Sequence, residues 1–437
     1  MALATSEMHN VLLVTIDSLR PDFLGCYSDW ARAEQLSPRL DAWAEQACLF
    51  RTSISQGPRT PESFPAILSG QYASRYLDIY SGLSEKRRLI SEILKEHGYA
   101  CAAFNSNPYI SRRKGYGRGF DLYEDSVPLG PPRGLKGKVF INLLKLRNLF
   151  CEPYTPAPNI NHQVFSWLKG RSGPLFLWVH YMDVHGPYIP KRGFRYYQRV
   201  KAGCLWRKAT HAPEQVTPEE GQRLRAAYKE EIRYTDRFLM ELIESFDPAK
   251  TLVIITADHG ELFGEHGLYA HAFKLYDTLL RVPLLIRLPG QQQGRRIPEM
   301  VRSLDIVPTV LDTLGLGSGS DLDGRSLRPL MGVEKSPWVR QPAISEIWSK
   351  HLSVRTEDWK LIANYAEGWQ ELFDLAADPA ESNNLIAVRP EVAAELEKVI
   401  RQHLLNMNAP EEDLRQCGID ATTDAATESR LRALGYM

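Results

Sequence analysis

The feature that most constrains the fold of this chain is a repeated alternation of short apolar segments with longer amphipathic ones. The short segments are apolar along most of their length, not only at every second residue, which is typical of strands buried on both faces. They lie at residues 10–17, 100–107, 174–181, 251–258 and 282–289. Helical patterns alternate with them at residues 37–47, 88–99, 218–246 and 303–315. This order predicts an α/β fold in which a mainly parallel sheet lies between helices.

One long stretch interrupts the alternation. Residues 128–208 hold proline-rich pieces and a basic segment at residues 136–150, whose apolar face could contact a membrane surface. We favour a lid that packs beside the active site, because a short helix inside a globular chain more often packs on its own protein. We therefore treat residues 128–208 as an insertion.

The C-terminal part of the chain has a different pattern. A bridge rich in Gly, Ser and Pro at residues 315–337 leads into short runs of alternating polarity and a helical pattern at residues 390–405. These features predict a small antiparallel sheet with one helix. We expect a catalytic α/β domain at residues 1–335 and a C-terminal α+β subdomain at residues 336–437.

Charge and cysteine content narrow the class of protein. The 437 residues include 53 Lys plus Arg and 53 Asp plus Glu, so the formal net charge of zero provides no overall field for nucleic acid. The sequence contains no run of apolar residues long enough for a transmembrane helix, and none is expected. The six cysteines form no CxxC pair, which argues against a zinc cage or a disulfide framework and favours a reducing, cytoplasmic compartment.

Metal-binding side chains follow three of the predicted strands, at the edge where open α/β sheets bind ligands. They are Asp17 after the first strand, His180, Asp183 and His185 near the end of the strand at 174–181, and Asp258 and His259 at the end of the strand at 251–258. A single Asp in such a place is more often a helix cap or a turn residue. Three such strand ends at one edge instead predict a metal site, and carboxylates mixed with imidazoles suit zinc or manganese better than calcium.

Several motifs occur in a recognisable order. They are NVLLVTIDSLRPD at residues 10–22, HYMDVHGPY at 180–188, TADHGELFGEHG at 256–267, LYDTLLRVPLLIRLPG at 275–290 and ELFDLAADPAESNNL at 371–385. In this order they resemble the sulfatase family of the alkaline phosphatase superfamily, over about residues 10 to 406. The resemblance implies an alkaline phosphatase-like fold and an enzyme that hydrolyses ester bonds.

The family's nucleophile position falls on Thr60, in the segment PRTPESFPAILSG. Sulfatases make formylglycine from a cysteine in a C-x-P-x-R or C-x-A-x-R context, and none of the six cysteines has that context. Thr60 instead resembles the threonine nucleophile of nucleotide pyrophosphatases and phosphoethanolamine transferases. Thr60 followed by Pro61 also fits an ordinary helix N-cap with Pro at the first helical position. The two roles are compatible, because a helix N-terminus stabilises an incoming anion.

The resemblance also implies the metal ligands. Asp17, Asp258 and His259 match the family's ligands, and the Thr60 oxygen completes the set. Ser18 stands where sulfatases usually have a second aspartate, which makes this a poor calcium site. We expect one divalent ion, manganese or zinc rather than calcium or magnesium, and no formylglycine. Direct coordination would lower the pKa of the Thr60 hydroxyl toward neutrality.

Two further histidines match family positions. His185 stands where family members have a histidine that contacts the transferring group. His271 stands where sulfatases have lysine and phosphoethanolamine transferases have histidine. We assign both as catalytic, because histidine stabilises charge on non-bridging oxygens or protonates a leaving oxygen. His180, Asp183 and Asn107 are predicted substrate contacts, although His180 and Asp183 could equally be structural or part of a second metal site.

These features predict a metal-dependent hydrolase that acts on a small anionic ester substrate. The expected substrates are phosphate mono- or diesters, or phosphonate esters, cleaved through a phosphothreonine at Thr60. Phosphate is favoured over sulfate, because formylglycine releases sulfate by hemiacetal breakdown and a sulfothreonine lacks that exit. The alternatives are a sulfatase that works without formylglycine, a transferase resembling phosphoethanolamine transferases, and a non-catalytic sulfatase-like binding protein.

Overall fold

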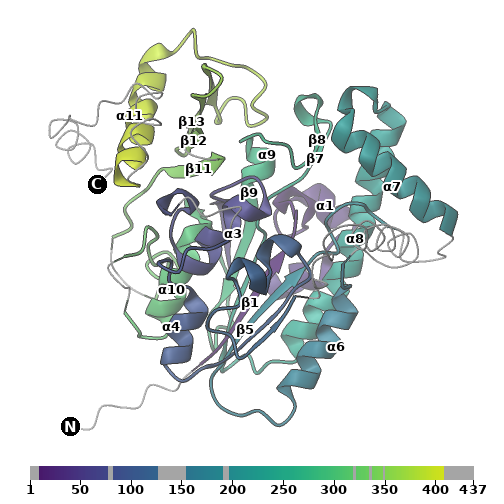
Figure 1. Ribbon diagram of the computed structural model, residues 1–437, viewed down its shortest axis with the longest axis vertical. Helices are drawn as coiled ribbons and strands as arrows, with labels where there is room; N and C mark the ends of the chain where they lie inside the picture. The colour runs from purple at the N-terminus through teal and green to yellow at the C-terminus, as the bar shows by residue number, and fades with distance from the viewer. Residues whose placement is uncertain are drawn as a thin grey trace, which may run out of the picture.

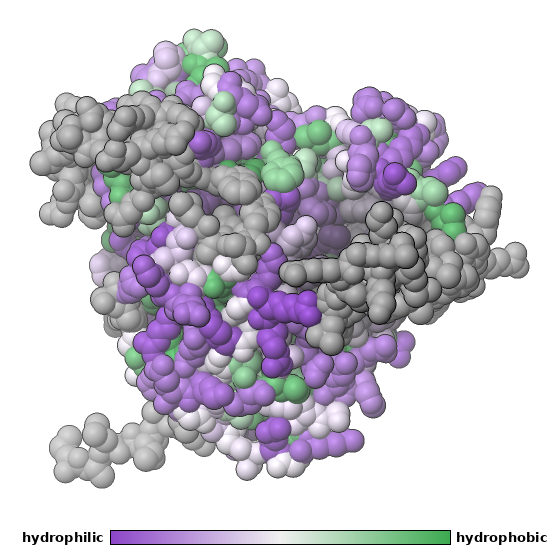
Figure 2. Space-filling view, in the orientation of Figure 1, coloured by the Kyte–Doolittle hydropathy of each residue, from purple (hydrophilic) through white to green (hydrophobic). Residues whose placement is uncertain are grey.

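The computed structural model describes residues 9–76, 82–125, 154–189, 196–317, 321–333, 337–347 and 350–407. Figure 1 shows a central sheet with helices on both faces and a second, small sheet close to helix α11 near the C-terminus. Figure 2 shows that hydrophilic residues dominate the described part of the visible face, with hydrophobic residues in small scattered groups.

The central sheet has eight strands in the order β10-β2-β9-β6-β1-β5-β3-β4. Their bounds are β1 Asn10–Ile16, β2 Cys48–Ile54, β3 Ala100–Phe104, β4 Leu122–Glu124, β5 Leu175–Tyr181, β6 Thr251–Thr256, β9 Arg281–Arg287 and β10 Arg295–Arg302. Strand β9 runs antiparallel to β2 and β6, and the other neighbouring pairs are parallel. The predicted mainly parallel α/β fold is therefore confirmed.

Apolar runs do not reveal three strands of this sheet, namely β2, β10 and the three-residue edge strand β4. Strand β2 exposes Arg51 in its middle, and the pairing of β2 with β9 shifts register near that residue. Strand β10 reads RRIPEMVR and lies at the edge of the sheet, where only part of each face is buried. Irregular and edge strands lack the apolar run that identifies a central strand.

Helices cover both faces of the sheet and form two separate cores. One core contains apolar residues of α2, α6 and α8, and the other contains apolar residues of α3, α4 and α10. The helix bounds are α1 Asp29–Ala33, α2 Pro38–Ala44, α3 Thr60–Ser69, α4 Ile90–Glu96, α6 Ala157–Leu168, α7 Tyr196–His211, α8 Pro218–Glu244, α9 Asp277–Leu280, α10 Ile306–Thr313 and α11 Pro390–Asn406. Two short strands, β7 Leu262–Phe263 and β8 Tyr269–Ala270, form a hairpin after β6.

Helix α2 is capped by a side chain from another helix. Ser37 is its N-cap residue, but the Ser37 hydroxyl donates to Asp41 Oδ1 at 2.9 Å and makes no capping bond. The carboxylate of Asp236, on α8, instead accepts from the backbone N–H groups of Arg39 at 3.1 Å and Leu40 at 2.8 Å. This contact joins α2 to α8 on the same face of the sheet, because unpaired N–H groups at a helix start need acceptors.

The C-terminal sheet is an antiparallel meander with α11 packed on it. Its strands are β11 Ala343–Ile347, β12 His351–Arg355, β13 Trp359–Asn364 and β14 Trp369–Asp374, paired in that order. It is joined to the main sheet next to the site, where the backbone N–H of Glu346 donates to the carbonyl of Gln56 at 2.9 Å. Buried Lys360 forms ion pairs with Asp277 and Glu381, both at 2.7 Å. The predicted small antiparallel sheet with one helix is confirmed.

The predicted insertion at residues 128–208 contains helix α6, strand β5 and most of helix α7, which ends at His211. Its basic segment at residues 136–150 lies outside the described residues, so its role as a lid or membrane contact stays a prediction. Within the part of the chain that the structure describes, no helix is both long and apolar enough to cross a membrane.

Candidate active site

Strand alternation brings the predicted site residues to one face of the sheet. On β1, Val11 and Leu13 pack into the core that includes α3. Because successive side chains point to opposite faces, Asp17 continues the row of Val11 and Leu13. The same alternation along β5 and β6 places His180 and Asp258, the latter just past the end of β6, on this side of the sheet. Because β1, β5 and β6 are parallel neighbours, their ends bring these groups together beside the start of α3.

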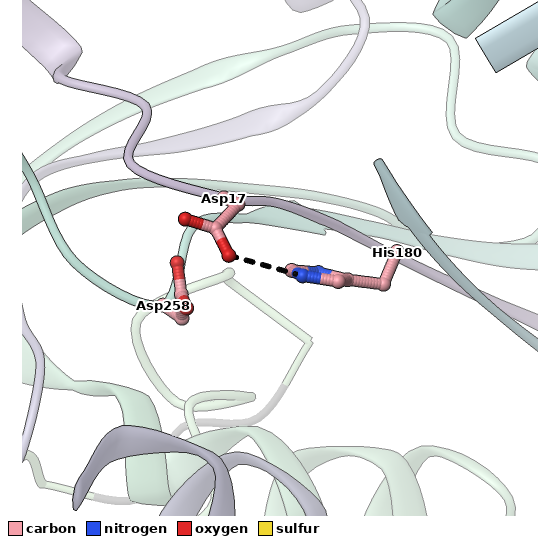
Figure 3. Close-up of side chains that lie close together, drawn as sticks. All are labelled: Asp17, His180 and Asp258. Carbon is pink, nitrogen blue, oxygen red and sulfur yellow. Dashed lines mark ion pairs between the residues drawn. The ribbon is translucent and has the colours of Figure 1, made fainter. Parts of the chain in front are cut away.

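Asp17, His180 and Asp258 form a buried cluster (Figure 3). One ligand atom from each lies within 4.8 Å of the others, and none of the three side chains is exposed. His180 Nε2 lies 3.3 Å from Asp17 Oδ2, and its other ring nitrogen contacts the Thr15 hydroxyl at 2.9 Å. His180, predicted as a substrate contact or structural residue, thus lies directly among the carboxylates.

Thr60 is the first residue of α3. Its hydroxyl donates to Asp258 Oδ2 at 2.9 Å and lies 3.4 Å from Asp17 Oδ2. The sequence pattern predicts Thr60 as the N-cap and Pro61 as the first helical residue. The helix instead begins at Thr60, and Arg59, in extended backbone, is the N-cap. The carbonyl of Arg59 accepts the N–H of Ser63 at 3.1 Å. As a result the Thr60 hydroxyl is directed to the carboxylates rather than to its own helix.

His259 completes the predicted ligand set. Its Nε2 lies 3.5 Å from Asp258 Oδ2 and 3.7 Å from Asp17 Oδ1, and it has no hydrogen-bond partner although it is buried. Its Nδ1 lies 2.8 Å from the carbonyl oxygen of Gly260, to which only a protonated Nδ1 can donate. That tautomer leaves the Nε2 lone pair directed at the two carboxylates, which is the arrangement of a histidine that binds metal.

The pKa values of the two carboxyl groups, Asp17 and Asp258, are shifted in opposite directions. Burial raises the pKa of Asp258, and the neighbouring charge of Asp17 raises it further. Burial also acts to raise the pKa of Asp17, but the charge of His185 and the contact with His180 outweigh it and hold that pKa well below its usual range. The pKa of His259 is raised, because the two carboxylates outweigh the effect of burial. Two buried carboxylates facing one point require a proton or a cation between them.

The residues present fit a divalent metal ion. Asp17, Asp258, His259 and Thr60 converge with two carboxylates, one imidazole and one hydroxyl, and the buried, unpartnered Nε2 of His259 is turned toward them. His180 Nε2 also lacks a hydrogen-bond partner and lies beside Asp17. Unpaired buried nitrogens beside carboxylates are costly without a ligand, so this donor set matches the predicted mixed oxygen and nitrogen site.

Asn107 and Ser18 support the same cluster. Asn107 Nδ2 lies 3.0 Å from Asp17 Oδ2 and 3.2 Å from Thr60 Oγ1, so this predicted substrate contact reaches the proposed nucleophile. Ser18, at the position where the resemblance implies a second aspartate, donates its hydroxyl to Asp17 Oδ1 at 2.8 Å and its N–H to Asp258 Oδ1 at 3.2 Å. Its φ of +60° lies in the left-handed region, which turns the chain sharply after Asp17.

His185 and His271 lie together at the rim of this cluster. Their ring centroids are 5.0 Å apart, and the rings of His271 and His259 are also 5.0 Å apart. Burial lowers the pKa of His185, and burial with the charge of His259 lowers the pKa of His271 to about 4. His185, His271, Thr60 and Asn107 all line one cavity of about 440 Å³. The structure thus brings both predicted catalytic histidines to the cavity that Thr60 faces.

Asp183 is placed differently from the other predicted residues. It is fully buried, and its carboxylate accepts from the N–H of Ala157 at 2.9 Å, at the first turn of α6. This contact caps α6 on the face of the sheet opposite α3, which accounts for a buried aspartate here. Contact between Asp183 and substrate stays a prediction.

Sequence reasoning misses Glu261, which holds the rim of the site. Its buried carboxylate lies 3.4 Å from His271 Nδ1 and accepts from the Tyr188 hydroxyl at 2.9 Å. Burial raises the pKa of Glu261 to about 7, against the charges of His185 and His259. Its place in the ADHGEL motif, two residues after His259, is the signal that could have identified it.

Two family models match this chain. The sulfatase family model matches residues 9–316, and the model of the C-terminal region of N-sulphoglucosamine sulphohydrolase matches residues 264–409. A choline-sulfatase of Rhizobium meliloti is 29% identical over 438 residues, which cover 87% of this chain and 83% of that relative. The arylsulfatase K of Gallus gallus is 33% identical over 205 residues, 43% of this chain and only 38% of that relative's length.

Solved structures show the same fold. A phosphonate monoester hydrolase of Agrobacterium radiobacter superposes with a TM-score of 0.69 at 21% identity, covering 92% of this chain and 95% of the other. A putative sulfatase of Bacteroides thetaiotaomicron superposes with a TM-score of 0.73 at 17% identity, covering 96% of each chain. The family model spans well over half of the chain and carries the strands that hold Asp17, His180 and Asp258. This chain belongs to the sulfatase family.

Proposed function

We propose that this chain is a metal-dependent hydrolase of phosphate mono- or diesters, or of phosphonate esters, with Thr60 as its nucleophile. One observation carries the proposal. The Thr60 hydroxyl lies at the start of a helix, 2.9 Å from Asp258 Oδ2, among the residues that would hold a metal ion. A threonine hydroxyl that faces two buried carboxylates is placed to lose its proton and to attack an anionic ester.

The preference for phosphate rests on chemistry at Thr60. No cysteine of the chain lies in a context that yields formylglycine, so the aldehyde hydrate that expels sulfate is absent. A threonine ester of sulfate has no such internal exit, whereas water hydrolyses a phosphothreonine by a second in-line displacement. The choice of phosphate over sulfate therefore follows from the residue at the nucleophile position.

Asp17, Asp258, His259 and Thr60 would hold the metal, manganese or zinc in our proposal. A bound divalent ion would supply charge neutralisation and favour the deprotonated form of a nearby hydroxyl. Asn107 would orient the Thr60 oxygen through its 3.2 Å contact. Beyond these residues, the transferring group would meet histidines at the cavity rim.

The reaction then proceeds in two displacements. The Thr60 oxygen attacks phosphorus as the bond from phosphorus to the leaving oxygen breaks, and the hydroxyl proton passes to Asp258 Oδ2. The leaving group departs as an alkoxide or phenolate and takes its proton from solvent. The bound anion would favour the protonated forms of His185 and His271. Each protonated ring would donate a hydrogen bond to a non-bridging oxygen, where negative charge accumulates. Water then attacks phosphorus and releases one proton to solvent, and Thr60 recovers its own proton from Asp258 as the bond from phosphorus to the Thr60 oxygen breaks and phosphate leaves.

A comparison of variants at position 60 tests the proposal. We expect Thr60→Ala to abolish turnover of aryl phosphate mono- and diesters, and Thr60→Ser to retain part of it, because serine keeps the hydroxyl. Full turnover by the alanine variant would refute the nucleophile assignment. Thermal unfolding of both variants controls for folding.

Sulfatase activity without formylglycine is the second candidate. The sulfatase family model and the choline-sulfatase relative favour it. Aryl sulfate and aryl phosphate esters, offered to the same metal-loaded protein, separate the two candidates. Faster cleavage of the sulfate, by the ratio of kcat/KM, would assign the chain to sulfate esters.

A further inference from the structure

The cavity beside Thr60 has more room than a phosphate group needs. Its volume is about 440 Å³, within the range of cavities that enclose a whole small ligand. Three large aromatic side chains in the described part of the chain are exposed, and two of these, Tyr109 at 49% and Phe273 at 55%, line this cavity. Exposed aromatic rings that gather at one cavity indicate a binding surface.

Arg59 holds the ring of Phe273 in place. The central guanidinium carbon lies 3.4 Å from the centroid of the Phe273 ring, so one face of the ring is covered. Arg59 Nη2 also pairs with Glu62 at 2.5 Å, and the Glu62 side chain is fully buried beneath it. Arg59 itself lines the cavity, next to Thr60. Phe273 therefore forms a flat platform, with Arg59 on one face of the ring and the other face available to a ligand.

Another part of the lining comes from the end of helix α7. Ala209 and Thr210 of α7 line the cavity with small side chains. Helix α7 is held there by Trp206, which packs against Tyr188 with ring centroids 5.2 Å apart. A Cβ atom at Gly186 would lie 2.4 Å from the Trp206 ring, so only glycine allows this approach. The room between α7 and the Phe273 platform is therefore fixed by packing.

The charge of the lining selects the ligand. None of the described residues that line the cavity is Asp or Glu, and two imidazoles lie at the rim. Arg59 presents its guanidinium to the cavity, whereas its partner Glu62 is buried and does not line it. A leaving group with a quaternary ammonium would meet Arg59 and no carboxylate. It would also find one face of Phe273 already occupied by a cation, which weakens a second cation–π contact. A neutral or anionic ring instead gains stacking on Phe273 or Tyr109.

We infer that this cavity is a leaving-group subsite that favours esters of a flat, neutral or anionic ring and disfavours esters of a quaternary ammonium alcohol. The inference rests on the proposed function in that the ester is cleaved at Thr60. It sets this chain apart from its choline-sulfatase relative, although the two share most of their length.

Binding to a variant that cannot turn over tests the subsite separately from the chemistry. Thr60→Ala protein, loaded with manganese, is titrated calorimetrically with phenyl phosphate and phosphorylcholine, and then with phenyl sulfate and choline sulfate. The two esters are compared for whichever anion, phosphate or sulfate, binds more tightly. For that anion we expect the phenyl ester to bind about tenfold more tightly than the choline ester. Adding Phe273→Ala should weaken the phenyl ester about threefold to tenfold and leave the choline ester within about twofold.

Two further variants complete the test. Arg59→Gln should bind the choline ester more tightly, because it removes the cation that repels it. Val388→Ala, at a residue 68% exposed and outside the cavity, is the matched control and should change neither affinity. Equal affinity for the two esters, no measurable binding of either, or a Phe273→Ala profile identical to that of Val388→Ala would overturn the inference. Failure of wild-type protein to cleave any phosphate ester would refute only the proposed function, since the affinity ratio is read without turnover.

Discussion

Replacing Lys360 with methionine should destabilise the protein severely, although Lys360 lies outside the site. Its side chain is fully buried, and its Nζ pairs with Asp277 Oδ1 and Glu381 Oε1, both at 2.7 Å. Arg355 also pairs with Asp277, at 2.9 Å, so two cations balance two carboxylates. Methionine keeps much of the side-chain volume but leaves Glu381 without its cation.

The magnitude follows from the burial of these groups. Removing one partner of a buried ion pair costs about 3–5 kcal/mol, because the remaining charge stays desolvated. Part of this cost is recovered when Glu381 takes up a proton, since burial already raises its pKa to about 7, against the effect of Lys360. We expect Lys360→Met to lower the free energy of unfolding by about 3 kcal/mol near neutral pH, and to lower the thermal midpoint by about 3 °C.

The pH dependence of this loss provides an internal check. The folded-state pKa of Glu381 lies above its unfolded value, so its contribution to stability is full below the unfolded pKa and is lost as pH rises through about 7. Loss of the Lys360 charge raises the pKa of Glu381 further. The deficit of Lys360→Met should therefore shrink when unfolding is measured at about pH 5 instead of about pH 8.

The control is an exposed lysine of the same subdomain. Lys398 pairs with Glu395 on the surface of α11, and Lys398→Met should change stability by less than about 1 kcal/mol. Adding Glu381→Gln to Lys360→Met should recover part of the loss, because no charge is left unpaired. Differential scanning calorimetry that finds Lys360→Met as stable as Lys398→Met would refute the argument.

Three further predictions follow from the structure. Asp236→Asn should flatten the pH dependence of stability between about pH 4 and 7, by up to about 3 kcal/mol. Burial raises the pKa of Asp236 to about 6, so the stabilising effect of this carboxyl is lost as pH rises through that value. Urea unfolding at several pH values measures this change. His180→Gln should lower metal affinity about tenfold to a hundredfold, because His180 orients Asp17 from 3.3 Å; competition with a chromogenic chelator measures it, and unchanged affinity would contradict the assignment. Treatment with a chelator should abolish activity, and manganese or zinc should restore it; activity that persists in metal-free protein would contradict the proposed metal site.

Much of the fold follows from the sequence because its central strands are apolar on both faces. The row Val11, Leu13 and Asp17 shows why the site follows as well, since alternation along a parallel strand fixes which side a strand-end residue faces. Strand β10 could not be recognised in this way, because an edge strand with the sequence RRIPEMVR carries no apolar run. Its place is set by pairing with β2, which is a long-range contact.

The site was predictable where it depends on strand ends, and less so where it depends on loops. Asn107 follows β3 through an irregular loop, and only the folded chain shows its amide beside Thr60. The 3.4 Å contact of Glu261 with His271 depends on the β7–β8 hairpin, whose two-residue strands leave no sequence pattern. The stacking of Arg59 on Phe273 joins residues more than two hundred positions apart, so no local pattern predicts it.

The most direct test of the central claim is mass spectrometry of Thr60 after brief exposure of metal-loaded protein to an aryl phosphate ester. Rapid acid quenching and proteolysis should yield the peptide that contains Thr60 with the added mass of one phosphoryl group on that residue, and Thr60→Ala should yield none. An unmodified Thr60 during steady turnover, a phosphoryl group on another residue, or a sulfated Thr60 after exposure to an aryl sulfate that turns over faster would contradict the account.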